Sequence, residues 1–364
     1  MHFFILICSM LIIWQPIGGF AQGSDAIAHV PALRDGQHDF DFNIGHWKTH
    51  IVRRLHAFTA NKDVMILNGT VSVQKIWNGK ANLEVIEADG PKGHFEGTTL
   101  FLYNPASHQW SQNYAGSDDA DISNPTVGEF KDGRGELYSQ DTYEGRHILV
   151  RGVWDHIKPD SHTYEESLSD DGGKTWVPAF SASLTRDQSA STEPWVAGVS
   201  GPVADTARPG EHEFDFALGT WKEHTTRLQH PLTGSTNWEK MEGISVVHKI
   251  WNGRGNLTEL ESDGPNGHLE LLALRLYSQD THQWHLTFAT SKVGVLGLPQ
   301  TIGEFKNGVG QFYDQESYGD KTILLRFTIT PISADSYRSE QAFSDDAGKT
   351  WETNWVNNYE RVKD

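Results

Sequence analysis

Four glutamates form two pairs whose spacing could support acid–base chemistry. Glu87 and Glu96 lie nine residues apart, and Glu261 and Glu270 repeat that spacing further along the chain. A carboxyl group that is desolvated by burial holds its proton more tightly, so a buried glutamate could polarise a substrate oxygen near neutral pH. Glu96 and Glu270 are therefore the candidate catalytic residues. A general acid also needs its substrate within hydrogen-bond reach, and the spacing alone does not establish that geometry.

The 18 histidines of the chain favour no metal centre. No His-Glu-x-x-His motif occurs, and His46 and His50 would share one face of a strand opposite Trp47, which is typical of an exposed face. A metal site at the rim of the fold is the alternative, because two histidines recur in the second half of the chain. These are His50 with His224 and His56 with His230. Phosphate loops, dinucleotide fingerprints and Gly-x-Ser-x-Gly elbows are also missing, so we predict neither a metal nor a cofactor.

The elements that must position these residues occur twice. Phe40–Lys48 returns as Phe214–Lys222, and the offset stays at 174 or 175 residues to the end of both copies. Hairpin turns such as Asn78-Gly79 and its counterpart Asn252-Gly253 separate short alternating runs, and no stretch has a helical period. About eight to ten short antiparallel strands per copy, without a helical layer, predict an all-β fold that closes into a barrel or forms a sandwich.

Strand parity predicts which polar groups face the interior of each copy. Side chains alternate across a sheet, so an inward Trp47 also points Arg53 inward. Leu100 and Leu102 recur as leucines in the second copy, which indicates a core parity that also carries Glu96. Extended to all strands and both copies, this argument predicts ten ligand-binding residues. They are Arg53, Glu96, Trp110, Gln140, Arg151, Arg227, Glu270, Trp284, Gln315 and Arg326.

Inward charges of this kind allow two interpretations. An unpaired charge costs several kcal/mol to bury, so these groups must pair with each other, reach the mouth of the fold or meet a ligand. A mostly apolar interior with a few converging polar groups is the usual form of a small-molecule site. The alternative is that Arg–Glu pairs simply fill a small barrel.

A Gly-x-Trp motif opens each copy, and an arginine stands near the end of each copy. The motifs are Gly45-His46-Trp47 and Gly219-Thr220-Trp221, with Arg186 and Arg361 as the terminal arginines. This combination resembles the lipocalin-like (calycin) superfamily, and each copy resembles an exported bacterial lipocalin-like domain of unknown function. The resemblance implies two tandem antiparallel lipocalin-like β-barrels, in which the tryptophan closes one end and the arginine packs across its indole. The nitrobindin branch of the superfamily binds haem through a histidine, which makes haem a remote alternative to the absence of a cofactor.

Two short segments, Ser169–Trp176 and Ser344–Trp351, resemble the Asp-box turn of sialidases. Sialidase propellers repeat this box in every blade, whereas it occurs here once per copy. Aspartate and serine side chains satisfy backbone groups in such turns. We therefore predict that each segment locks a hairpin, and we do not interpret it as a glycosidase signal.

Amino-acid composition along the chain indicates where its segments begin and end. An apolar run followed by Gly19-Phe20-Ala21 predicts a signal peptide over residues 1–21 and therefore a periplasmic or secreted protein without a membrane span after cleavage. Cys8 is the only cysteine, so the mature chain has no disulfide. The net charge of −18 argues against nucleic acid as a partner. The predicted segments after the signal peptide are a leader over 22–37, a first barrel over 38–186, a linker over 187–211 and a second barrel over 212–364.

The first functional hypothesis is an exported binding protein. Its barrel would hold a small, largely apolar molecule of lipid, terpenoid or polyketide type. An enzyme is the rival hypothesis, because tandem lipocalin-like barrels also occur in proteins that hydrate, cyclise or isomerise such molecules. A buried glutamate would then be the acid or base. A third hypothesis is a structural or interaction protein with filled barrels.

Overall fold

The computed structural model describes residues 34–189 and 210–363. The predicted signal peptide, most of the leader and most of the linker lie outside the described residues. Both barrels belong to one compact unit that begins at Asp35. In the described part of the chain, no helix has the length and hydropathy needed to cross a bilayer.

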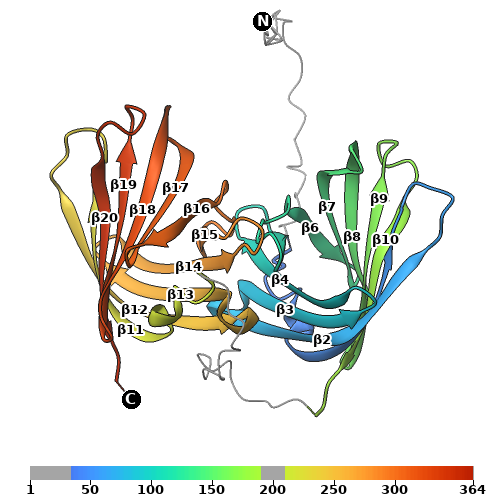
Figure 1. The fold of residues 1–364 in the computed structure, drawn as a ribbon. Coiled ribbons are helices and arrows are strands. Elements are labelled where there is room, and N and C mark those ends of the chain that lie inside the picture. The colour runs from blue at the N-terminus through green and yellow to red at the C-terminus, as the bar shows by residue number, and fades with distance from the viewer. Residues whose placement is uncertain (1–33, 190–209, 364) are drawn as a thin grey trace, which may run out of the picture. The chain divides into compact units, whose positions relative to one another are not determined.

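Ten antiparallel strands close into the first barrel, drawn from blue to green in Figure 1. Each strand pairs with its neighbours in sequence, and β1 closes the barrel by pairing with β10. The strands are β1 (Gly45–Arg54), β2 (Val64–Ile76), β3 (Ala81–Gly90), β4 (Gly93–Asn104), β5 (Gln109–Gly116), β6 (Thr126–Lys131), β7 (Arg134–Tyr143), β8 (Arg146–Lys158), β9 (Ser161–Ser169) and β10 (Val177–Arg186). Two 3₁₀ turns accompany them, η1 (Asp41–Asn43) and η2 (Trp77–Gly79).

Ten further strands close into the second barrel, drawn from yellow to red. They are β11 (Gly219–Leu228), β12 (Trp238–Ile250), β13 (Gly255–Gly264), β14 (Gly267–Tyr277), β15 (Trp284–Thr290), β16 (Thr301–Lys306), β17 (Val309–Tyr318), β18 (Lys321–Ser333), β19 (Ser336–Ser344) and β20 (Glu352–Arg361). The 3₁₀ turns η3 (Asp215–Ala217) and η4 (Trp251–Gly253) occupy the places that η1 and η2 have in the first barrel. The predicted fold class, two tandem antiparallel β-barrels, is confirmed.

The tryptophan of each Gly-x-Trp motif plugs one end of its barrel. Trp47 is fully buried and donates from Nε1 to the Asn43 carbonyl at 2.7 Å. The Arg186 guanidinium lies 4.0 Å from the centre of the Trp47 ring and donates to the Ile44 carbonyl at 3.1 Å. In the second barrel, Arg361 lies at the same 4.0 Å from the Trp221 ring. The predicted packing of the terminal arginine across the indole is confirmed, and it adds a cation–π contact to hydrogen bonds.

Four strands, β3, β4, β13 and β14, have buried side chains on both of their faces. One face of β4 turns Phe101 and Tyr103 into the interior of the first barrel. The other face carries Leu100 and Leu102, which belong to a separate core that combines residues of both barrels, including Leu274 from β14. Because β3, β4, β13 and β14 are buried on both faces, the two barrels share a continuous apolar contact in addition to their separate interiors.

The two Asp-box segments form the predicted hairpin locks. In the first, Gly173 N–H donates to Ser169 Oγ at 2.9 Å, and Thr175 N–H donates to Asp171 Oδ1 at 2.9 Å. The hydrogen bonds from Thr175 lower the pKa of Asp171 to about 2. The second box repeats the arrangement around Asp346. In each box the aspartate carboxylate accepts hydrogen bonds from the turn, and these bonds stabilise the turn without a ligand.

Candidate functional site

Two of the predicted site residues, Arg53 and Arg227, have the predicted parity. Arg53 stands opposite Phe180 near the end of β1 that lies away from Trp47. Arg227 stands opposite Trp355 in the second barrel, with its guanidinium 5.0 Å from the Trp355 ring. Both arginines are exposed, so they lie at the mouths of the barrels, opposite the ends that the Gly-x-Trp tryptophans close.

Trp110 and Trp284 contribute to the barrel interiors as expected. Each is at most 1% exposed and belongs to the interior core of its barrel. Trp110 donates from Nε1 to the Gly36 carbonyl at 2.8 Å, and Trp284 donates to the Gly210 carbonyl at 3.0 Å. These bonds join the segments that precede η1 and η3 to the walls of the barrels, so the indole N–H groups are already used by the fold.

Glu96 and Glu270 do not face the barrel interiors, and that part of the prediction is wrong. Glu96 forms an ion pair with Arg254 of the second barrel. Glu270 accepts a hydrogen bond from Lys80 of the first barrel at 3.1 Å. The matched leucines of β4 and β14 form the core between the barrels, so the parity that they indicate points at the other barrel. Burial alone would raise the pKa of Glu270, but hydrogen bonds from Ser291 and Lys80 outweigh it and lower the pKa.

Four more predicted residues lie on outer faces, contrary to the parity argument. Gln140 and Gln315 are exposed. The Arg151 guanidinium lies 4.6 Å from the ring of Trp176, the Asp-box tryptophan. Arg326 repeats this contact in the second barrel, at 4.5 Å from Trp351. Both arginines stack on the tryptophan of a hairpin lock on the outer face. This contact explains why an arginine occurs at the same position of both copies, which the parity argument attributed to the barrel interior.

The buried acid of the first barrel is Glu84, which the sequence reasoning missed. Glu84 is 5% exposed and accepts hydrogen bonds from Asn43 Nδ2 at 3.1 Å and from Thr99 Oγ1 at 3.4 Å. Burial raises its pKa to about 7, and the two hydrogen bonds only partly oppose that shift. A signal was present in the sequence, because Glu84 shares its parity with Ile86 and Ala88, which both face the interior.

Polar groups line the first barrel between Glu84 and its mouth. Tyr114 and Glu166 face inward; burial raises the pKa of both groups, and the charge of Arg53 opposes that rise. Gln112 Nε2 donates to the Tyr164 hydroxyl at 3.2 Å. The interior therefore offers two acids, an amide and two phenols among aromatic rings.

Apolar side chains at the same mouth are only partly covered. Met65, Ile86, Phe95 and Phe180 pack against the interior core of the first barrel and are half-buried. The strand pairings place Met65 and Phe180 beside Arg53, and Phe95 near the β3–β4 turn, at the end opposite Trp47. Solvent therefore reaches apolar interior surface from this end, as it would at the entrance of a barrel that admits a ligand.

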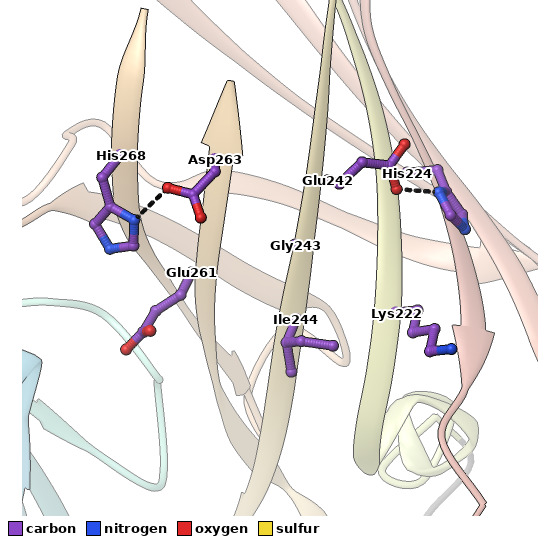
Figure 2. A pocket seen from close by; sticks show the side chains of 8 residues that line it. All are labelled: Lys222, His224, Glu242, Gly243, Ile244, Glu261, Asp263 and His268. Carbon is purple, nitrogen blue, oxygen red and sulfur yellow. Dashed lines mark hydrogen bonds and ion pairs between the residues drawn. The ribbon is translucent and has the colours of Figure 1, made fainter. Parts of the chain in front are cut away.

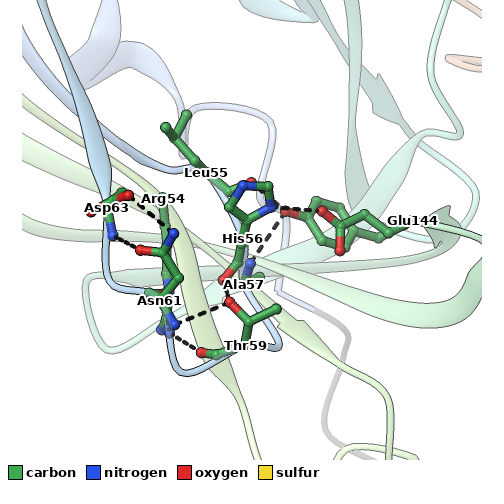
Figure 3. A network of polar contacts seen from close by, with 9 residues as sticks. Arg54, Leu55, His56, Ala57, Thr59, Asn61, Asp63 and Glu144 are labelled. Carbon is green, nitrogen blue, oxygen red and sulfur yellow. Dashed lines mark hydrogen bonds and ion pairs between the residues drawn. The ribbon is translucent and has the colours of Figure 1, made fainter.

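The loop between β1 and β2 folds beside this mouth and is held by its own polar network (Figure 3). His56 Nδ1 lies 3.0 Å from Glu144 Oε1, and Ala57 N–H donates to the Tyr143 hydroxyl at 3.2 Å. Arg54 donates to loop carbonyls. The buried Ala57 packs on a small apolar cluster of β8 and β9. The network gives this edge of the mouth a defined shape.

The second barrel has a different interior. Its buried acid is Glu223 on β11, whose pKa burial raises to about 7. A cation, Arg275, occupies the place on β14 that Phe101 has on β4, and it is 3% exposed. The charge of Arg275 opposes the rise in the pKa of Glu223. The first barrel has no cation at this depth in its described residues, so the two interiors offer different chemistry.

A groove of about 440 Å³ lies on the outer face of the second barrel, across β11 to β14 (Figure 2). Its two histidines already have carboxylate partners. His224 pairs with Glu242, and His268 Nδ1 lies 2.9 Å from Asp263 Oδ1. No group of three or more His, Cys, Asp or Glu side chains within residues 34–189 and 210–363 is placed to hold a metal ion.

No protein-family profile matches the chain, and no curated protein matches it. A phycobiliprotein lyase, CPES of Guillardia theta, aligns with 43% of this chain and 96% of its own at 12% identity and a TM-score of 0.32. The protein EF1p2_mFAP2b bound to DFHBI aligns with 42% and 99% at 8% identity and a TM-score of 0.24. A DUF3598-family protein of unknown function from Nostoc punctiforme aligns with 91% and 100% at 10% identity and a TM-score of 0.19. The chain itself folds into two closed ten-stranded antiparallel barrels.

Proposed function

We propose that this chain is an exported binding protein that holds a small, largely apolar ligand inside its first barrel. The observation that carries the proposal is the buried acid Glu84, which lies deep in an aromatic interior whose mouth leaves apolar side chains half-exposed. A mostly apolar site with few polar groups binds the apolar body of a ligand by burial and orients it by hydrogen bonds. The choice of the first barrel follows from its interior, because a buried cation, Arg275, occupies the second.

The polar groups indicate what the ligand must present. With its pKa raised to about 7, Glu84 is largely protonated below that pH and can donate a hydrogen bond to a carbonyl or hydroxyl oxygen. Gln112 and Tyr164 lie in the same interior as this acid and can contact a second oxygen. A lipid, terpenoid or polyketide with one or two oxygens therefore fits the proposal better than a hydrocarbon.

The binding test uses the chain from Gln22 to Asp364, expressed in a bacterial periplasm. Native mass spectrometry and solvent extraction would identify any bound molecule, and Nile red, a neutral aromatic dye with a carbonyl group, would serve as a probe. We expect saturable dye fluorescence that Glu84→Gln weakens several-fold. Glu87→Gln is the matched control, because Glu87 lies on the same strand but is exposed on the outer face.

A second pair of variants assigns the barrel. Phe95→Ala enlarges the mouth of the first barrel, and Leu269→Ala makes the corresponding change in the second. Dye affinity that changes with Phe95→Ala alone supports the proposal. The proposal would be refuted if only Leu269→Ala changed the dye affinity, or if Glu84→Gln left the dye affinity unchanged. Export is tested separately with the full chain from Met1. A product that begins at Gln22 by N-terminal sequencing would support export, whereas an intact Met1 would oppose it.

The same acid favours one enzymatic alternative. A protonated carboxyl group buried beside aromatic rings is suited to protonate an alkene or polarise a carbonyl, as an isomerase or hydratase requires. In that case Glu84→Gln would abolish turnover of the extracted ligand and leave its binding in place. In the binding protein the same variant changes affinity, and the wild type shows no turnover to lose.

We also infer that the two barrels descend from one module by tandem duplication. The support is positional, because residues 174 apart make reciprocal contacts. Lys80 reaches Glu270, and Arg254 reaches Glu96. A dimer of identical barrels related by a two-fold axis would make both contacts with the same pair of residues, as isologous interfaces do.

A further inference from the structure

The interior of the second barrel contains a buried cation without an ion-pair partner. Arg275 is 3% exposed, and its Nη1 donates to Asn256 Oδ1 at 3.2 Å. Its guanidinium lies 5.0 Å from the Phe214 ring, and its Nε–H has no hydrogen-bond partner. Among the residues described in the structure, no carboxylate lies within ion-pair distance of Arg275. A guanidinium offers five N–H donors, so most of its hydrogen-bonding capacity is left open.

The interior of the second barrel contains another unused donor. Tyr337 is 2% exposed, and its hydroxyl has no hydrogen-bond partner. Tyr337 belongs to the same interior core as Phe214, whose ring lies 5.0 Å from the Arg275 guanidinium. The neighbouring phenol, Tyr359, differs because its oxygen already accepts a hydrogen bond from Asn357 Nδ2 at 3.0 Å. Two buried donors without acceptors therefore line the same interior.

Such a pair of donors requires an acceptor. Buried polar groups in folded proteins are almost always hydrogen-bonded, and a buried charge without a partner is strongly unfavourable. Arginine is also the residue best shaped to hold carboxylate and similar planar anions through two parallel N–H bonds. In the first barrel Phe101 replaces Arg275 and His162 replaces Tyr337, so the requirement belongs to the second barrel only.

We propose that the interior of the second barrel binds a small anion or a carboxylate group, held by the Arg275 guanidinium and the Tyr337 hydroxyl. The site is separate from the ligand site of the first barrel. Its ligand chemistry is shared by free monoanions, such as formate, and by the carboxylate end of a larger apolar molecule. A free monoanion and a carboxylate-bearing apolar molecule differ in size, so ligands of different chain length distinguish them.

Glu223 makes this site sensitive to pH. The titratable and charged groups that act on Glu223 come from three strands, namely Arg275 on β14, Tyr337 on β19 and Tyr359 on β20. A bound anion repels ionised Glu223, so binding favours its protonated form. With a pKa of about 7, Glu223 is about 90% protonated at pH 6 and about 10% at pH 8. Binding should therefore weaken about tenfold between these values.

Isothermal titration calorimetry on the full chain would test the proposal, with formate exchanged for sulfate at constant ionic strength. We expect saturable formate binding at pH 6 that is about tenfold weaker at pH 8. Glu223→Gln should keep the binding and remove this pH dependence. Arg275→Phe, which installs the residue of the first barrel, should abolish binding, and Phe101→Leu should leave it unchanged. Octanoate that binds at least 100-fold more tightly than formate would identify a carboxylate-bearing ligand, and equal affinities would identify a free small anion.

Several results would overturn the proposal. One is the absence of formate and octanoate binding to the wild type at pH 6, and another is binding that survives Arg275→Phe. If Arg275→Phe does not fold, Arg275→Lys replaces it, and a retained affinity would count against the guanidinium. A crystal structure grown with bromide provides an independent readout. Anomalous density beside Arg275 Nε would support the site, and a water molecule in that place would overturn it.

Discussion

Replacement of Glu84 by glutamine should change the pH dependence of stability in a calculable way. The folded-state pKa of Glu84 is about 7, against 4.5 for an unperturbed glutamate. The folded protein therefore binds the proton more tightly than the unfolded chain between these two values. The contribution of Glu84 to stability is largest below pH 4.5 and is lost as the pH rises through 7, because the ionised carboxylate remains buried. Glutamine has the same shape and does not titrate.

The size of the effect follows from the difference of 2.5 pKa units. Each unit is worth about 1.4 kcal/mol, so the full loss is on the order of 3 kcal/mol for this 5% exposed side chain. Roughly 1 kcal/mol is lost by pH 5, and nearly the full loss is reached by pH 8. The free energy of unfolding of Glu84→Gln minus that of the wild type should therefore rise by roughly 2 kcal/mol from pH 5 to pH 8.

Urea unfolding followed by tryptophan fluorescence and circular dichroism at pH 5, 6, 7 and 8 would measure that difference. Glu87→Gln, exposed on the same strand, should give a flat difference. Carboxyl ¹³C chemical shifts of labelled glutamate would give the folded pKa independently, through the resonance that Glu84→Gln removes. A variant-minus-wild-type difference that stays within about 0.5 kcal/mol across this range would refute the buried, raised-pKa assignment of Glu84.

Three further predictions concern the ends and the contact of the barrels. Burial lowers the pKa of His162 to about 4 from 6.5, so wild-type stability is lost as the pH falls between these values. His162→Phe should move the acid-unfolding midpoint, followed by circular dichroism, to lower pH, and an unmoved midpoint would contradict this reasoning. Arg186→Lys keeps the charge but loses the planar fork that stacks on Trp47 and bonds backbone carbonyls, so urea unfolding should show a loss of about 1–3 kcal/mol. Arg254→Glu places two carboxylates together between the barrels, so the same assay should show strong destabilisation. The double variant Arg254→Glu/Glu96→Arg should recover at least half of that loss, and no recovery would argue against the pair.

The architecture could be predicted because its determinants are local and repeated. Alternating strands and tight turns specify an all-β chain, and the Gly-x-Trp motif with its terminal arginine specifies how each barrel is closed. Trp47 was a sound anchor for parity on β1, since it is fully buried and fixes the direction of Arg53. The same approach failed wherever the anchor was a repeated aliphatic residue.

The parity argument fails on these strands for a physical reason. When both faces of a strand are buried, both alternating sets of side chains are apolar, and an apolar residue does not indicate which face points into the barrel. On β4, Phe101 belongs to the barrel interior and Leu100 to the core between the barrels. Repetition selected Leu100, since the contact between barrels uses the same residues of both copies. The interiors differ in side-chain type, so repetition between the copies does not identify their residues. Glu84 is such a residue, because its counterpart in the second copy is Thr258.

Residues repeated in both copies form the contact between the barrels, whereas residues that differ between the copies distinguish the two interiors. The repeated charges, Glu96 and Glu270, are neutralised by Arg254 and Lys80, and they join the barrels without leaving a free acid. The unrepeated charges remain inside the barrels, with Glu84 and Glu166 in the first and Arg275 and Glu223 in the second. A pair that served only to fill space would be expected at matched positions in both copies. The buried charges do not match, and each barrel has kept a different one at a desolvation cost. We therefore expect the two interiors to bind different molecules, a neutral oxygen-bearing ligand in the first and an anionic group in the second.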